Sequence, residues 1–176
     1  MKSVFVVVDM QKDFIDGALG SSEALGTVPV VCEKIQNFNG DELFVTLDTH
    51  YENYLHTLEG KKLPVPHCIL GSEGHRLNGE VEKALDGKKY TEIKKTTFGT
   101  FEIAKLLSQK YEGEELSIEV AGLCTDICVI SNVLILRAAF PNAQITVDSR
   151  ACAGVTVEKH CAALEAMRSC QIDVLD

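Results

Sequence analysis

Short runs of apolar and β-branched residues recur along the chain and predict six buried strands. They lie at residues 4–8, 43–47, 89–94, 116–120, 143–147 and 172–175. The first run reads VFVVV and has no polar position. A run of this kind is typical of a strand that is covered on both faces, as in a parallel sheet.

Stretches with helical periodicity lie between these runs. We predict helices over residues 27–38, 75–85, 101–109, 126–139 and 155–168. Strands that alternate with helices indicate an α/β domain with a parallel sheet covered on both sides, and we expect one domain over residues 1–176. In such sheets ligands bind beyond the carboxyl ends of the strands.

The stretch from residue 49 to residue 74 departs from this alternation, because it has no clear helical or strand periodicity. A loop of this length without secondary structure is uncommon in a compact domain and is usually functional. We therefore expect it to contribute to a site.

Composition and charge narrow the function classes. Of 176 residues, 45% are hydrophobic and 24% charged, which is close to the average of globular domains. The net charge of -9 argues against binding to nucleic-acid phosphates or to an anionic membrane surface. The seven cysteines are an odd number, which favours reduced thiols, and no apolar run is long enough to span a membrane. We expect a cytoplasmic protein with small-molecule ligands.

Charged residues stand at the ends of the first and third predicted strands. Asp9 follows the first strand, so its carboxylate is expected in the cleft at the carboxyl edge of the sheet, or else as a helix cap or solvated loop residue. Lys94 and Lys95 end the third strand. A lysine there can lower the pKa of a nearby thiol, whereas an isolated lysine pair is more often solvated.

Two cysteines follow the fourth predicted strand, where a helix begins. Cys124 lies in the turn and Cys128 just inside the helix. Backbone amides at a helix N-terminus push a thiol towards the thiolate and can hold an oxyanion. The spacing differs from the C-x-x-C of metal and redox pairs, and a buried, inert cysteine is the alternative for either residue.

A group of metal-ligating residue types follows the second predicted strand. Asp48 and His50 are two residues apart and so share one side of an extended segment, and His67 follows within the irregular stretch. This set is typical of zinc or a similar divalent ion, and hydrogen bonding within the loop is the alternative. His56 and His75 are expected at the surface. One edge of one sheet is thus expected to carry an acid, a lysine, a thiol and a group of metal-ligating residues. This combination favours an enzyme.

Five ordered motifs extend this interpretation to a family. They are VDMQKDF at 8–14, DTH at 48–50, EGKKLPVPHC at 59–68, KTTFGTF at 95–101 and GLCTDICV at 122–129. With these motifs the chain resembles the isochorismatase-like cysteine hydrolases, and within them the nicotinamidases, over nearly its whole length. The resemblance implies a three-layer α/β/α fold with six parallel strands in the order 3-2-1-4-5-6.

The resemblance also implies catalytic roles. Cys128 matches the nucleophile, Asp9 the general base and Lys95 the third catalytic member. The peptide between Leu123 and Cys124 matches a cis bond of the family, which aims the amides of Cys124 and Cys128 into an oxyanion hole.

The same resemblance implies a metal site and a substrate site. Asp48, His50 and His67 match the metal ligands of the nicotinamidases, and Glu59 is the nearest match to a glutamate that some relatives place before the third ligand. Zinc is the metal that we expect, with iron or manganese as alternatives. Phe14 matches an aromatic residue that lines the substrate ring.

The reaction that this resemblance implies is hydrolysis of nicotinamide to nicotinate and ammonia through a thioester, as in pyridine nucleotide salvage. The chain has no tryptophan, which many nicotinamidases place against the pyridine ring, and Leu63 or Val65 stands in that neighbourhood. The alternatives are a related cysteine amidase for ureido or carbamoyl substrates and a catalytically silent metal-binding member. Relatives also imply a homo-oligomer, either a dimer or a tetramer.

Overall fold

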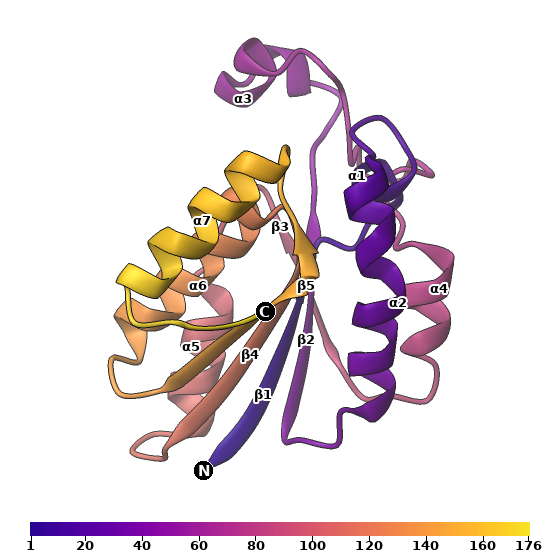
Figure 1. Cartoon of the computed structure of the whole chain (residues 1–176). Helices are drawn as coiled ribbons and strands as arrows, with labels where there is room; N and C mark the ends of the chain where they lie inside the picture. Colours follow the sequence, from indigo (N-terminus) through magenta and orange to yellow (C-terminus); the bar gives the residue numbers. More distant parts are fainter.

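A parallel sheet of six strands forms the centre of the computed structural model, which describes residues 1–176 (Figure 1). The strands lie in the order β3-β2-β1-β4-β5-β6, and all neighbours are parallel. Their bounds are β1 (Lys2–Val8), β2 (Glu42–Asp48), β3 (Thr91–Lys95), β4 (Leu116–Leu123), β5 (Gln144–Ala153) and β6 (Asp173–Leu175). The predicted fold class and strand order are confirmed.

Helices cover both faces of the sheet (Figure 1). One face carries α2 (Ser22–Asn37) and α4 (Gly79–Ala84), and the other carries α5 (Glu102–Lys110), α6 (Ile130–Ala139) and α7 (Val157–Ser169). Alternate residues of β1 belong to two separate apolar cores: Val4 and Val6 to one, Phe5 and Val7 to the other. The wholly apolar sequence of β1 therefore follows from burial on both sides.

Several element boundaries differ from the predicted ones. The helix α2 begins at Ser22 rather than at residue 27, because the Ser21 side chain accepts a hydrogen bond from the amide of Ala24 and caps the helix. Asn78 caps α4 in the same way, so this helix begins at Gly79 rather than at residue 75. The strand β5 continues to Ala153, beyond the predicted end at residue 147.

The expectation of a structureless stretch at 49–74 is wrong. It contains a 3-10 turn, η1 (Tyr54–His56), and a short helix, α3 (Leu58–Lys62), which stand above the carboxyl ends of the strands (Figure 1). Tyr54 is buried, and its hydroxyl donates to the carbonyl of Leu63. These elements are too short for their periodicity to be visible in the sequence.

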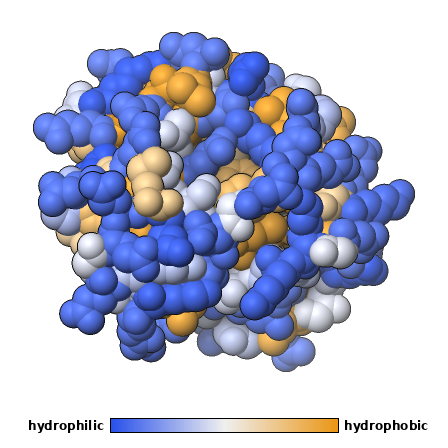
Figure 2. Space-filling model, turned by 90° about the horizontal axis from the view of Figure 1, so that it is seen from below, coloured by the Kyte–Doolittle hydropathy of each residue, from blue (hydrophilic) through white to orange (hydrophobic).

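The opposite end of the molecule, seen from below, presents mostly hydrophilic residues with scattered apolar patches (Figure 2). None of the helices combines the length and the apolar character that crossing a membrane requires.

Candidate active site

Asp9 occupies the first position after β1, and its backbone turns there. Its φ of +50° lies in the left-handed region, which costs a non-glycine residue about 1–3 kcal/mol and is typical of functional sites. The Asp9 amide donates to the carbonyl of Thr46 in β2, 3.1 Å away, and the residue is completely buried. The carboxylate therefore points from the end of the sheet into the protein, not into solvent.

Lys95 brings this carboxylate and the thiol of Cys128 together. Its Nζ lies 2.6 Å from Asp9 Oδ2 and 3.5 Å from Cys128 Sγ, and all three side chains are buried. Lys95 ends β3, and only β2 separates β3 from β1, so the side chain reaches across one strand. The neighbouring Lys94 is exposed instead, and its Nζ lies 3.6 Å from Glu92 Oε1.

Burial and neighbouring charges shift the pKa values of the side chains in this trio. Burial and the neighbouring Asp9 raise the pKa of the Cys128 thiol well above its ordinary value, and the opposing charge of Lys95 does not overcome them. Burial also raises the pKa of Asp9, although Lys95 opposes it. The position of Cys128 at the start of a helix therefore does not lower the pKa of its thiol. The thiol therefore keeps its proton at rest, and the Asp9 carboxyl group lies against the Lys95 ammonium.

Thr46 holds the second carboxylate oxygen of Asp9, a role that the sequence analysis missed. Its Oγ1 donates to Asp9 Oδ1 at 2.6 Å, and both residues are fully buried. The only signal in the sequence is that Thr46 is a polar residue within an otherwise apolar strand interior. Together Thr46 and Lys95 engage both oxygens of the carboxylate and fix its orientation.

Cys128 lies in a turn of π-helix, η2 (Thr125–Val129), that leads from β4 into α6. The Leu123–Cys124 peptide is cis, as the family resemblance implies. Cys124 is partly exposed, and both cysteines line the same cavity. The second thiol is thus close to the first but has no acid or lysine hydrogen-bonded to it.

The predicted metal ligands converge above the end of β2. Asp48 Oδ2 lies 2.9 Å from His50 Nε2 and 3.6 Å from His67 Nε2. Glu59 Oε1 lies 3.5 Å from His50 Nε2 and 3.6 Å from His67 Nε2, so α3 adds a fourth donor. The three predicted ligands are all buried.

These four donors fit a divalent metal ion. Bonds of about 2.0–2.1 Å to nitrogen and oxygen in a tetrahedral site separate the ligand atoms by roughly 3.3 Å, which is close to the observed separations. His67 Nδ1 lies 2.8 Å from the carbonyl of Val65, which leaves Nε2 for a metal. Asp48 and Glu59 raise the pKa of His50 to about 9 although its burial opposes them, so a metal must displace a proton from this ring.

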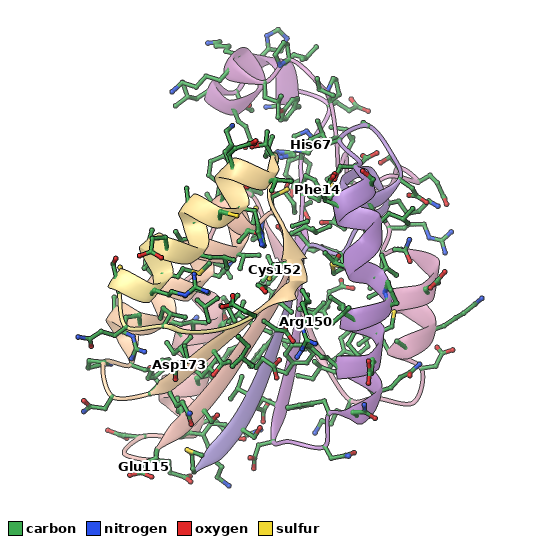
Figure 3. The ribbon with its side chains drawn as sticks, viewed as in Figure 1. Phe14, His67, Glu115, Arg150, Cys152 and Asp173 are labelled. Atoms are coloured by element: carbon green, nitrogen blue, oxygen red, sulfur yellow. The ribbon has the colours of Figure 1, made fainter.

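A cavity of about 890 Å³ opens over the thiol and the metal ligands. Phe14 lines it, as predicted, and its ring lies 5.4 Å from that of His67; Figure 3 places both side chains at the upper end of the sheet. Leu63 lines the cavity, whereas Val65 does not. The remaining wall includes several apolar side chains: Leu19, Leu58, Phe98, Ile127 and Val155.

The sequence and fold of this chain are similar to those of known proteins. A family model described as the isochorismatase domain matches residues 3–176. The chain belongs to the isochorismatase family. A relative from Bacillus subtilis (strain 168), described as the uncharacterized isochorismatase family protein PncA, is 28% identical over 173 residues, which cover 93% of each sequence.

Two solved structures show how closely this family member follows known folds. The nicotinamidase/pyrazinamidase PncA from Bacillus subtilis has a TM-score of 0.85 and 27% identity, and the match covers 100% of both chains. The pyrazinamidase of Pyrococcus horikoshii in complex with zinc has a TM-score of 0.79 and 24% identity, and the match covers 100% of this chain and 99% of the other.

In this isochorismatase-family chain two further buried residues support the metal ligands. The Gln11 side chain donates to the carbonyls of Asp48 and His75, both at 2.9 Å, and accepts from the amide of Asp48 at 2.7 Å. His75 is buried with its Nε2 3.0 Å from Thr49 Oγ1, so its predicted surface position is wrong; the loop from 72 to 78 packs it under the end of β2. His56 is exposed, as predicted.

Proposed function

We propose that this protein is a metal-dependent cysteine amidohydrolase that converts nicotinamide to nicotinate and ammonia. The observation that carries the proposal is the buried trio: Lys95 Nζ lies 2.6 Å from Asp9 Oδ2 and 3.5 Å from the Sγ of Cys128, and Cys128 lines the cavity. The similar Bacillus subtilis structure is that of a nicotinamidase/pyrazinamidase, which supports this choice of reaction.

The first half-reaction forms a thioester. Asp9 takes the proton from Cys128 Sγ as the sulfur attacks the carboxamide carbon, and the amides of Cys124 and Cys128 stabilise the oxyanion. When the tetrahedral intermediate collapses, the C–N bond breaks and Asp9 returns the proton to the leaving nitrogen, which departs as ammonia. Lys95 remains charged throughout and stabilises the developing thiolate.

The second half-reaction hydrolyses the thioester. Asp9 takes a proton from a water molecule, the hydroxide oxygen attacks the thioester carbon, and the C–S bond breaks. Cys128 leaves as a thiolate and recovers its proton from Asp9, which completes the cycle with release of the carboxylic acid. The first half needs a base in direct reach because the resting thiol is neutral, and the second half needs one to take a proton from the attacking water.

Asp48, His50, Glu59 and His67 would hold the metal ion, with zinc as the first candidate and iron or manganese as alternatives. A zinc ion present in the Pyrococcus horikoshii pyrazinamidase supports this choice. An ion held by these residues would act as a Lewis acid that orients the substrate. Phe14 and Leu63 then contact the ring, since no tryptophan is available.

Ammonia release from nicotinamide, with the metal content measured on the same sample, tests this proposal. Release of ammonia with about one metal ion per chain supports it. Hydrolysis of a ureido substrate in preference to nicotinamide would assign the chain to the carbamoyl-type amidases, and a bound metal without hydrolysis of any amide would show a catalytically silent member.

A further inference from the structure

The outer part of the cavity carries a positive charge that the proposed chemistry does not use. Apart from the histidines, two acidic and two basic side chains line the cavity: Asp48, Glu59, Lys62 and Lys159. The two carboxylates contact His50 and belong to the proposed metal site, where a divalent ion would balance both charges. The two lysines remain without a partner in an otherwise acidic chain of net charge -9.

Lys62 and Lys159 come from two different elements. Lys62 is the last residue of α3, above the sheet, and Lys159 lies in the first turn of α7, at the end of that helix nearest α3 in Figure 1. Neither ammonium forms a salt bridge or a hydrogen bond, whereas Lys34 and Lys95 are each paired with two carboxylates. Both lysine side chains are exposed and free to turn into the cavity.

Apolar side chains that are largely exposed line the same cavity as the lysines and the thiol. Leu58 is 72% exposed, Val155 52% and Phe98 45%, and all three line the cavity. A cavity of about 890 Å³ lies near the upper end of the range for ligand pockets, and a single-ring amide fills only part of it. The remaining space has an apolar wall and a cationic rim.

We infer that the site hydrolyses nicotinamide but prefers to it a primary amide with an apolar body and an anionic group at the end remote from the carboxamide. The inference rests on the proposed function, because that function places the carboxamide at Cys128. Lys62 and Lys159 then act as specificity-determining residues for the anionic group. Exposed ion pairs are weak singly, so the two lysines together are expected to give about a tenfold preference.

Binding to a protein without the nucleophile tests this inference separately from catalysis. Zinc-loaded C128A is titrated by calorimetry with 3-carbamoylphenylacetate and with its uncharged methyl ester at low ionic strength. The acid is expected to bind about tenfold more tightly than the ester, and the preference should shrink to about twofold or less in C128A/K62Q/K159Q. It should also fall with added salt, because these charges are exposed.

C128A/K61Q is the matched control, since Lys61 precedes Lys62 on α3 but does not line the cavity. The control should keep the tenfold preference. Equal affinity for acid and ester, or a preference that survives in the double lysine variant, would overturn the inference. Failure of the native protein to hydrolyse nicotinamide, with the binding preference intact, would overturn only the proposed reaction.

Discussion

Lys95 links the proposed catalytic trio to the metal ligands through Asp48. Its Nζ lies 3.4 Å from Asp48 Oδ1, while Asp48 Oδ2 lies 2.9 Å from His50 Nε2. One carboxylate thus contacts Lys95 with one oxygen and the candidate metal ligand His50 with the other. Lys95 also separates the buried carboxylates of Asp9 and Asp48, whose charges would otherwise repel each other.

Removing this lysine is expected to affect both stability and activity. Lys95→Met leaves two buried carboxylates without their cation, which should lower the free energy of unfolding by about 3–5 kcal/mol and abolish amide hydrolysis. Urea denaturation and ammonia release measure the two effects. The variant K95M/D9N removes one of the charges, so it should recover part of the stability and none of the activity; full stability of K95M alone would contradict the ion-pair assignment.

The hydrogen bond from Thr46 should set the pH at which Asp9 becomes a base. It stabilises the charged carboxylate, so Thr46→Val raises the pKa of Asp9, and the acidic limb of kcat/KM moves to higher pH by about one unit. Thr46→Ser keeps the hydroxyl and should keep the native profile. A uniform loss of rate in T46V without a shift of the limb would indicate a purely structural role.

Glu59 is predicted to be a true metal ligand. Glu59→Gln should weaken zinc binding by about 10- to 100-fold, and His67→Ala by more, in competition with a chromophoric chelator. Glu52→Gln is the control, because Glu52 lies in the same segment but neither lines the cavity nor approaches the histidines. Native zinc affinity in E59Q would restrict the site to Asp48, His50 and His67.

Asp148 should make the free energy of unfolding depend on pH in the acidic range. Burial would raise its pKa, but hydrogen bonds from Arg150 and Lys34 outweigh burial and lower the pKa to about 2, against an ordinary value of 3.8. This ion pair therefore stabilises the protein above pH 3.8 and loses its effect as the pH falls towards 2.

Asp148→Asn tests this dependence. The variant should be about 2 kcal/mol less stable than the native protein at neutral pH, and the difference should shrink between about pH 4 and pH 2. Urea denaturation at several pH values gives the comparison, and a difference that does not change with pH would contradict it.

The parts of the site that follow strand ends were predictable from the sequence. Asp9 comes directly after the apolar interior of β1 and Asp48 ends β2, and parallel strands place their carboxyl ends at one edge of the sheet. Cys128 was predictable as a residue at a helix start but not in its protonation. Burial and the charge of Asp9 decide that pKa, and both depend on packing between strands that are distant in the sequence.

The supporting hydrogen bonds were not predictable for the same reason. Thr46 contacts Asp9, and Gln11 contacts Asp48, each pair being 37 residues apart. Glu59 was only an approximate candidate, because the helix that carries it has five residues and its orientation depends on the fold of the whole segment. The expected dimer or tetramer stays a prediction, as does the cytoplasmic location.

The proposed mechanism requires that Cys128, and not Cys124, becomes acylated during turnover. Cys128 contacts Lys95, whereas burial raises the pKa of Cys124 to about 12 and no catalytic side chain is hydrogen-bonded to it. Acid quenching of the enzyme during nicotinamide hydrolysis, followed by peptide mass spectrometry, should find a nicotinoyl thioester on Cys128. C128A should be inactive, and C124A should keep most of the activity. An acyl group on Cys124, or turnover by C128A, would show that Cys128 is not the nucleophile.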